Sequence, residues 1–283
     1  MTRSNAQYLA VTLFLVFTIA ITTACQPANN KGVEIAREPE QTEQTSKPIL
    51  LSIIKQKAHD YPIPTQEECE RILRLRKADV NGLLLQEDGL YAIDKEGNYL
   101  SNQSIGFLNF NQEGKYTSGS DELDKLTWGI ISEFDIQHKS REQLLKDVYD
   151  YVVDNVTYVG AMNHDLSVKD SDGENGWTVP LAIQALDAGY GNCYAYASAF
   201  TALARNLGYQ AYSAGGIVGA AYQPHGWTIV TDNEGNIFMS DPETEYVRKY
   251  KMQKEVDLFM KKPDEFGAQT GLSYTQQNKR KTD

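Results

Sequence analysis

Three residues in the second half of the chain could act together on a carbonyl group. Cys193 follows Gly191-Asn192 and begins an alanine-rich run with helical spacing, so its thiol stands on the first turn of an expected helix. A helix N-terminus favours negative charge and lowers the pKa of such a thiol towards the reactive thiolate. His225 and Asp241 follow, and this order is the one expected for a nucleophile, its base and the group that orients the base.

The expected chemistry is nucleophilic catalysis without a cofactor. Cys193 would attack a carbonyl carbon as a thiolate, His225 would take the thiol proton and give it to the leaving amine, and Asp241 would fix the imidazole tautomer. Each residue alone also has a structural interpretation, as a small buried side chain, a strand histidine or a turn residue. A metal site made by Cys193 and His225 is a further alternative, but too few other ligands stand at zinc-site spacing, so no metal is expected.

The elements around these residues decide whether they can meet. A helix is expected from Cys193 to Gly208, and strand-like runs follow at residues 210–213, 217–218, 226–231 and 236–240. A turn separates the last two runs and makes them a hairpin.

The register of this hairpin determines whether the histidine and the carboxylate share a face. If Thr231 pairs with Gly235, His225 lies directly opposite Asp241 and the two side chains point the same way. If Thr231 pairs with Asn236, they fall on opposite faces of the sheet. The sequence leaves both registers open.

An oxyanion formed during attack by the thiol needs two hydrogen-bond donors. The backbone N–H of Cys193 is one of them. Upstream, Ser140 caps a helix whose apolar residues extend to Val153, a short strand is expected at residues 157–159, and a second helix lies near 181–187. The candidates for the second donor come from this part of the chain and are Tyr158, Trp177 and Gln184.

The first 25 residues are typical of an export signal. An apolar run covers residues 8–21 and is too short for a spanning helix, and Thr22-Thr23-Ala24-Cys25 follows it. The last four residues resemble a bacterial lipobox, which implies cleavage before Cys25 and a diacylglycerol on its sulfur. The alternative is an uncleaved membrane anchor. Both place the remaining chain outside the cytoplasmic membrane, on its extracellular face, with the membrane as a partner.

Residues 26–47 are polar and predict a flexible linker, and residues 48–136 combine a short helix with turns and aromatic residues. Within the second region, residues 90–99 recur as residues 107–116, shifted by 17 positions. Each copy predicts a β-hairpin. The copies resemble the short repeats of Gram-positive surface proteins, some of which bind cell-wall polymers. We therefore expect either a cell-wall contact through residues 90–117 or a small spacer subdomain.

Composition narrows the classes of partner. The chain has 283 residues, of which 41% are hydrophobic, and a net charge of −11. An acidic chain without a basic cluster is a poor binder of nucleic acid, so no such partner is expected. Of the three cysteines, Cys69 lies among glutamates on a helix and is expected to be inert, and no structural disulfide is expected.

Three motifs together resemble the transglutaminase-like superfamily over about residues 140–245. They are Gly191-Asn192-Cys193 with its alanine-rich helix, His225-Gly226-Trp227, and residues 236–242 ending in Asp241-Pro242. The resemblance implies an α+β, papain-like core in which the cysteine helix packs against an antiparallel sheet. The composition and the expected elements place this domain at residues 137–262, after the helix and β-hairpin-repeat region, and leave 263–283 as a loose polar tail. The resemblance also implies Tyr158 as the aromatic residue that assists the oxyanion.

The resemblance does not determine the reaction, because the superfamily includes cross-linking acyltransferases, peptidases, amidases and inactive members. We expect an exported, surface-anchored thiol enzyme that cleaves or transfers acyl groups at amide bonds of proteins or peptides. The alternative is a non-catalytic protein that binds the cell surface or cell wall and carries a relict domain.

Overall fold

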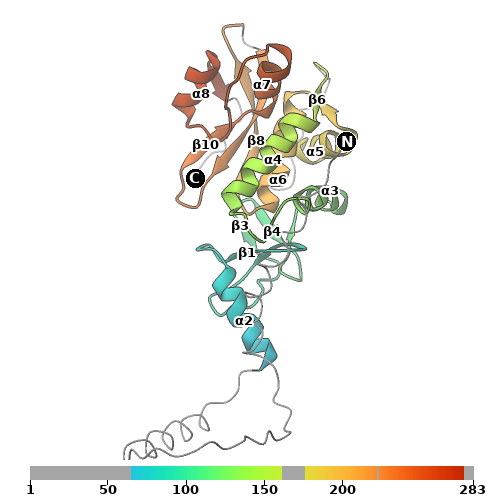
Figure 1. Cartoon of the computed structure of the whole chain (residues 1–283), viewed down its shortest axis with the longest axis vertical. Helices are drawn as coiled ribbons and strands as arrows, with labels where there is room; N and C mark the ends of the chain where they lie inside the picture. The colour runs from blue at the N-terminus through green and yellow to red at the C-terminus, as the bar shows by residue number, and fades with distance from the viewer. Residues whose placement is uncertain (1–64, 161–175, 222, 277–283) are drawn as a thin grey trace, which may run out of the picture. The chain divides into compact units, whose positions relative to one another are not determined.

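A computed structural model describes residues 65–160, 176–221 and 223–276 (Figure 1). The chain divides into two compact units, residues 1–73 and 74–283. Helix α2 (Gln66–Lys77) begins in the first unit, where Thr65 caps it and Glu68 accepts a hydrogen bond from the Thr65 backbone N–H at 2.7 Å. The predicted export signal, Cys25 and the linker lie outside the described residues. Across the described segments, every helix is too short or too polar to serve as a membrane span.

The second unit begins with two small antiparallel sheets. One pairs β1 (Leu83–Gln86) with β2 (Gly89–Ala92), and the other has the order β3 (Ser104–Ile105), β4 (Leu108–Phe110) and β5 (Tyr116–Thr117). Their buried side chains form one cluster, which comprises Leu83, Leu90, Ala92, Leu108, Phe110 and Tyr116. This region therefore has an apolar core of its own, built from the predicted repeat.

One turn conformation closes three hairpins of the chain. It begins at Asp94, Asn111 and Asp232, and in each case the backbone N–H of that residue donates to the carbonyl four residues later. The side-chain oxygen of the first residue accepts from the backbone N–H groups two and four residues on. A glycine with positive φ occupies the fourth position, as a three-residue hairpin loop requires. The first two turns lie within the two copies of the sequence repeat.

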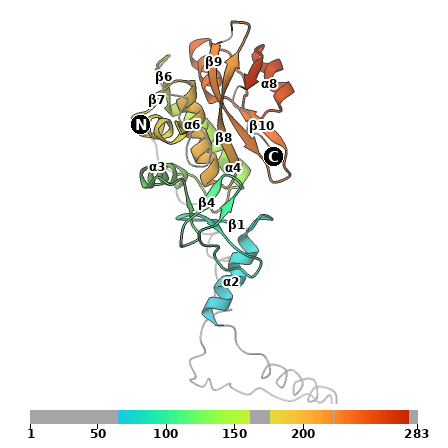
Figure 2. The ribbon, with the colours of Figure 1, turned by 180° about the vertical axis from the view of Figure 1, so that it is seen from behind.

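Four helices follow these two sheets in the described part of the chain. They are α3 (Asp121–Ile131), α4 (Arg141–Asn155), α5 (Thr178–Ala188) and α6 (Cys193–Asn206). Helix α6 is buried around almost its whole circumference, because it lies between α4 and α5 on one side and the main sheet on the other (Figure 2). Its small alanine side chains let these neighbours approach closely. The parallel strands β6 (Thr157–Tyr158) and β7 (Tyr190–Gly191) lead into it.

The main sheet is antiparallel and has the order β10-β9-β8-β11. Its strands are β8 (Gln210–Val218), β9 (Gln223–Thr231), β10 (Ile237–Ser240) and β11 (Tyr274–Gln276). The two strand-like runs predicted at 210–213 and 217–218 are thus one strand. The structure agrees with the predicted α+β architecture, in which the cysteine helix packs on an antiparallel sheet.

The prediction of a loose tail after Pro263 is wrong for residues 263–276. Helix α7 (Pro242–Tyr246) and the π-helix η1 (Val247–Lys251) follow β10, and then the chain forms α8 (Pro263–Thr270) and β11. Phe266 of α8 is fully buried, and β11 pairs with β8 at the sheet edge. The polar sequence concealed this packing, because few apolar side chains anchor it.

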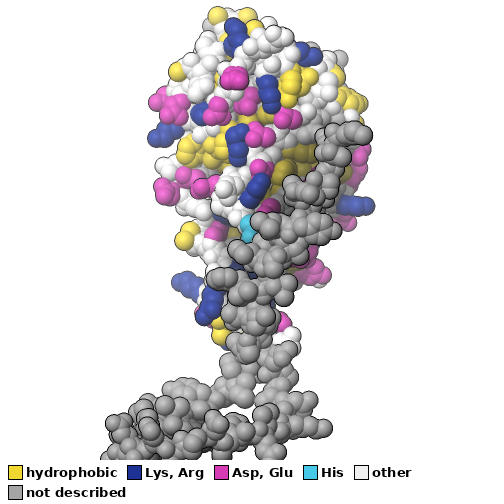
Figure 3. All heavy atoms as spheres, viewed as in Figure 1, with side chains coloured by type: hydrophobic (Ala, Val, Ile, Leu, Met, Phe, Trp, Pro, Cys, Tyr) yellow, Lys and Arg dark blue, Asp and Glu magenta, His cyan; other side chains and the backbone are white. Residues whose placement is uncertain are grey.

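Acidic and basic side chains are interspersed on the face of the molecule that Figure 3 shows. In that view, lysine and arginine side chains stand singly beside aspartate and glutamate, and hydrophobic side chains lie between them. The face drawn therefore presents no extended surface of a single charge.

Candidate active site

Helix α6 holds Cys193 at its N-terminus. The side chain of Asn192 caps the helix by accepting a hydrogen bond from the Ala195 backbone N–H at 3.3 Å. Gly191 passes so close to the first turn that a Cβ there would lie 2.3 Å from the Ala195 Cβ. Cys193 is 8% exposed, so a reactant has a narrow approach to a mostly buried thiol. These neighbours explain why glycine and asparagine precede the cysteine.

Strand β9 brings His225 to this helix end. Its neighbour Gly226 pairs with Gly215 of β8, and both glycines face Tyr194 of α6. A Cβ on Gly226 would lie 2.7 Å from the Tyr194 Cδ1 and 3.0 Å from its Cα, so only glycine permits this approach. His225 is 6% exposed, and its imidazole interacts with Cys193. The structure therefore brings the predicted thiol and imidazole together.

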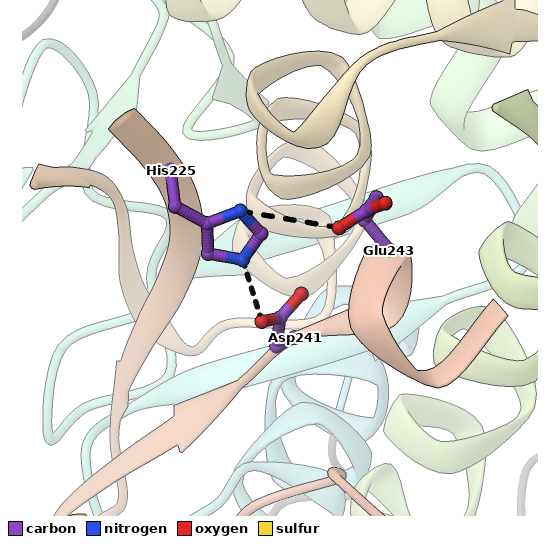
Figure 4. A group of neighbouring side chains, drawn as sticks. All are labelled: His225, Asp241 and Glu243. Atoms are coloured by element: carbon purple, nitrogen blue, oxygen red, sulfur yellow. Dashed lines mark hydrogen bonds and ion pairs between the residues drawn. The ribbon is translucent and has the colours of Figure 1, made fainter. Parts of the chain in front are cut away.

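Asp241 receives the other side of the imidazole. It follows β10 and caps α7, where its Oδ1 accepts a hydrogen bond from the Thr244 backbone N–H at 2.9 Å. Its Oδ2 lies 2.7 Å from the His225 Nε2 (Figure 4). Asp241 is fully buried, and the two hydrogen bonds fix the direction of its carboxylate.

The hairpin register differs from both predicted ones. Thr231 pairs with Ile237, because the turn at Asp232 encloses three residues rather than the shorter loops considered. The observed pairing differs from the first predicted register by an even number of residues. Side chains alternate between the two faces of a strand, so His225 and Asp241 still share a face, as diagonal rather than direct neighbours. The Asp-x-Glu-Gly pattern, which also occurs at Asp94, was the sequence signal for this turn.

Opposite charges stabilise each other inside the site. Burial by itself lowers the pKa of His225, but Asp241, through its charge and hydrogen bond, and contact with Cys193 outweigh it and raise this pKa well above its ordinary value. Burial raises the pKa of Asp241, but the charge and hydrogen bond of His225 outweigh burial and keep it below the ordinary value. The two residues therefore form a buried pair in which an imidazolium and a carboxylate stabilise each other.

Tyr274 is a site residue that the sequence interpretation missed. Its phenol donates to Oδ2 of Asp241 at 3.0 Å, the same oxygen that contacts His225. Its ring packs edge-on against Trp227 and near the imidazole. Tyr274 stands on β11, in the segment expected to be loose, and the only signal was a short alternation after a glycine.

Glu243 is the second missed residue. Its Oε2 lies 3.9 Å from the Nδ1 of His225, on the other side of the ring from Asp241 (Figure 4). Burial raises the pKa of Glu243 to about 7, the charge of Asp241 adds to the rise, and His225 opposes it. By distance these three side chains could surround a cation. However, the Nε2 of His225 is already hydrogen-bonded to Asp241 and the imidazole also interacts with Cys193, so the arrangement suits proton exchange rather than metal binding.

The three candidates for the second oxyanion donor differ in their surroundings. Gln184 donates its side-chain N–H to the Tyr190 carbonyl at 3.3 Å and is engaged. Tyr158 on β6 is half-buried and interacts electrostatically with Cys193. The Nε1 of Trp177 is buried without a hydrogen-bond partner in the described part of the chain. Tyr158 and Trp177 both remain candidates on these contacts.

One comparison with known proteins gives a family for part of the chain. The family model described as Transglutaminase-like superfamily matches residues 132–242. A solved structure of a candidate cysteine protease from Cytophaga hutchinsonii is 16% identical, with a TM-score of 0.32, and the match covers 56% of this chain and 53% of that one. A candidate protease from Parabacteroides distasonis ATCC 8503 is 15% identical, with a TM-score of 0.26, 50% of this chain covered and 31% of that one. No curated protein matches.

Proposed function

From the transglutaminase-like domain that residues 132–242 form, we propose that this protein is a thiol enzyme that cleaves or transfers acyl groups at amide bonds of proteins or peptides. One observation carries the proposal. The His225 imidazole lies 2.7 Å from the Asp241 carboxylate and also interacts with Cys193, and all three residues are buried, so the nucleophile, the base and the orienting group share one site.

The proposed reaction has two halves, formation of a thioester and its attack by an acyl acceptor, and Cys193 and His225 act in both. The Cys193 thiolate attacks the amide carbon, and the oxyanion is stabilised by the Cys193 backbone N–H and a second donor, Tyr158 or Trp177. His225 donates its proton to the leaving amine, and a thioester remains on the sulfur. The acyl acceptor then gives a proton to His225, attacks the thioester carbon and releases the thiolate. Water as acceptor gives hydrolysis, and an amine gives transfer.

Labelling with iodoacetamide at neutral pH tests the nucleophile. We expect rapid labelling of the wild type and of Cys69→Ala, and loss of this rapid labelling in Cys193→Ala, because His225 can accept the proton of the Cys193 thiol. A peptide-amide library then identifies the acyl donor. Labelling that is unchanged in Cys193→Ala and absent in Cys69→Ala would assign the reactive thiol to Cys69 and refute the proposal.

We further propose that the enzyme is exported and held at the extracellular face of the cell membrane by a lipid on Cys25. The support is the apolar run at residues 8–21 followed by Thr22-Thr23-Ala24-Cys25. The test is incorporation of an alkyne-tagged fatty acid in cells. It should label the wild type, fail with Cys25→Ala and persist in Cys193→Ala. Membrane retention of Cys25→Ala without label would indicate the uncleaved anchor instead.

A second function, binding of a cell-wall polymer through residues 90–117, is favoured by one pocket. This pocket has a volume of about 360 Å³ and is lined by Leu90, Lys115 and Tyr116 of the repeat together with Trp128 and Lys125 of α3. An aromatic ring beside amino groups suits a polar polymer. Lys115→Glu should reduce sedimentation with purified cell wall, whereas Lys95→Glu, outside the pocket, should not. Equal sedimentation of both variants and wild type contradicts the proposal.

A further inference from the structure

The strongest feature that the reaction above leaves unused is Glu243. The residue is 7% exposed and its side chain is nine-tenths buried, with one carboxylate oxygen directed towards the imidazole (Figure 4). Within the described residues its carboxylate makes no hydrogen bond, and no lysine or arginine forms an ion pair with it. A buried carboxylate without such partners is costly unless it serves a ligand.

The separation between Glu243 and His225 has a chemical meaning. The 3.9 Å between Oε2 and Nδ1 is too long for a direct hydrogen bond. It is, however, short enough for one oxygen or nitrogen atom to sit within hydrogen-bond distance of both groups. Cys193 interacts with the same imidazole, so an atom in that position would be on the side of the site that holds the thiol.

We propose that Glu243 is a further catalytic residue, which binds the acyl acceptor between its carboxylate and the Nδ1 of His225. This inference rests on the proposed function and adds the class of acceptor to it. The acceptor donates one hydrogen to Glu243 and the other to His225, so it must carry two hydrogens on the attacking atom. Water and primary amines satisfy this condition, whereas alcohols and secondary amines do not.

The second half of the reaction balances with Glu243 in this role. The acceptor atom forms a bond to the thioester carbon as its proton passes to the Nδ1 of His225. The carbon–sulfur bond breaks, and the electron pair leaves on Cys193 as a thiolate, which pairs with the imidazolium. Glu243 keeps its hydrogen bond to the second hydrogen throughout and gains no proton. Its contribution is orientation and electrostatic attraction of the acceptor.

The charge state of Glu243 depends on the groups around it. An ionised carboxylate accepts the hydrogen bond of the acceptor, and burial brings the pKa of Glu243 to about 7. The rate of the second half should therefore rise as the pH increases through about 7. The titratable groups that face this region are Cys193 and Tyr196 on α6, His225 on β9, Tyr158 on β6 and Asp241 before α7.

Two variants and an activated ester test the proposal. p-Nitrophenyl acetate acylates a reactive thiol and releases p-nitrophenol, so the first turnover reports acylation and the steady state reports attack by water. Glu243→Leu removes the acceptor-binding oxygen, and Glu243→Gln keeps an oxygen without the charge. We expect a burst close to the wild-type rate in both, followed by steady-state rates lower by about 10²-fold for leucine and about 10-fold for glutamine. Acetyl-enzyme should accumulate and be visible by mass spectrometry.

Competition between acceptors supplies a second measurement. Methylamine should increase wild-type turnover of the acetyl-enzyme, whereas dimethylamine should not, and Glu243→Leu should lose this discrimination. A burst and a steady state that fall together, or that both stay at wild-type values, overturn the role of Glu243. If the wild type shows no more reaction than Cys193→Ala, the thiol-enzyme function itself fails, and this proposal fails with it. The burst also shows that each variant is folded.

Discussion

Replacement of Gly226 by alanine should separate the nucleophile from its base without altering either residue. The added Cβ would lie 2.7 Å from Cδ1 and 3.0 Å from Cα of Tyr194, which follows Cys193 on α6. The Tyr194 ring can rotate, but its Cα belongs to a buried helix and cannot shift unless the helix moves. Strand β9 and the helix end must therefore move apart by about 0.5 Å or more, because interiors are close-packed.

The magnitude follows from this displacement. Overpacking of this kind costs about 1–3 kcal/mol, and for a domain of this size each kcal/mol lowers Tm by about 2–4 °C. Misplacement of reacting groups by about 1 Å costs about 10²-fold in rate, so we expect kcat to fall by roughly 10- to 100-fold. The loss of activity should exceed what the loss of folded protein explains, because the shift falls between Cys193 and His225.

Gly215→Ala is the matched control. Gly215 pairs with Gly226 across the sheet and faces the same tyrosine, but a Cβ there would lie 3.5 Å from Cε1, which is an ordinary contact. Burst kinetics with p-nitrophenyl acetate and thermal unfolding should be measured on both variants. Gly215→Ala should change the free energy of unfolding by less than about 1 kcal/mol and keep the wild-type acylation rate. Equal losses in the two variants, or none in Gly226→Ala, would refute the argument from close approach.

Four further variants test the remaining contacts. Asp241→Asn should lower kcat by about 10³-fold or more, because the imidazole loses its orienting charge, and a smaller loss in pre-steady-state acylation would contradict that role. Folding lowers the pKa of Asp241, so its carboxylate stabilises the native state at pH values above the unfolded pKa of about 3.9. This stabilisation is lost as the pH falls through the pKa of the folded state. The Tm difference between wild type and Asp241→Asn should therefore shrink in acid. Tyr274→Phe should leave KM unchanged and lower kcat by about 3- to 10-fold. The pKa that governs the loss of activity at alkaline pH should rise, because the Asp241 carboxylate loses a hydrogen-bond donor and holds the His225 imidazolium more tightly. An unchanged pH profile would limit Tyr274 to a packing role. Asp232→Ala should destabilise the hairpin by about 1–2 kcal/mol in chemical denaturation, and Asp94→Ala should do the same for the repeat, because both carboxylates accept equivalent backbone N–H groups.

The sequence was sufficient where the signal is local. Asn192 caps α6 through its own side chain, and Ser140 caps α4 in the same way, so residue type and spacing determine where both helices begin. The order of Cys193, His225 and Asp241 also follows directly from the chain. These features depend on contacts within a few residues, or on chemistry that few residue types can supply.

The sequence was insufficient where tertiary packing decides. Glu243 occupies the first turn of a helix, where an acidic residue is ordinarily exposed and favourable, but α7 packs against α4 and α6 and Glu243 is buried. Tyr274 belongs to a three-residue strand whose pairing partner, β8, lies far away in sequence. The hairpin register depended on loop type, and the wrong loop gave two wrong registers, one of which happened to have the correct parity.

The position of β11 constrains how the protein can be shortened for biochemical work. A chain that ends at residue 242, with the family match, or at residue 262 would leave the β8 edge without its partner strand. Unpaired N–H and C=O groups along such an edge recruit strands from other molecules, so these shortened forms should self-associate and lose solubility. Soluble, monodisperse preparations will need the chain to extend through residue 276.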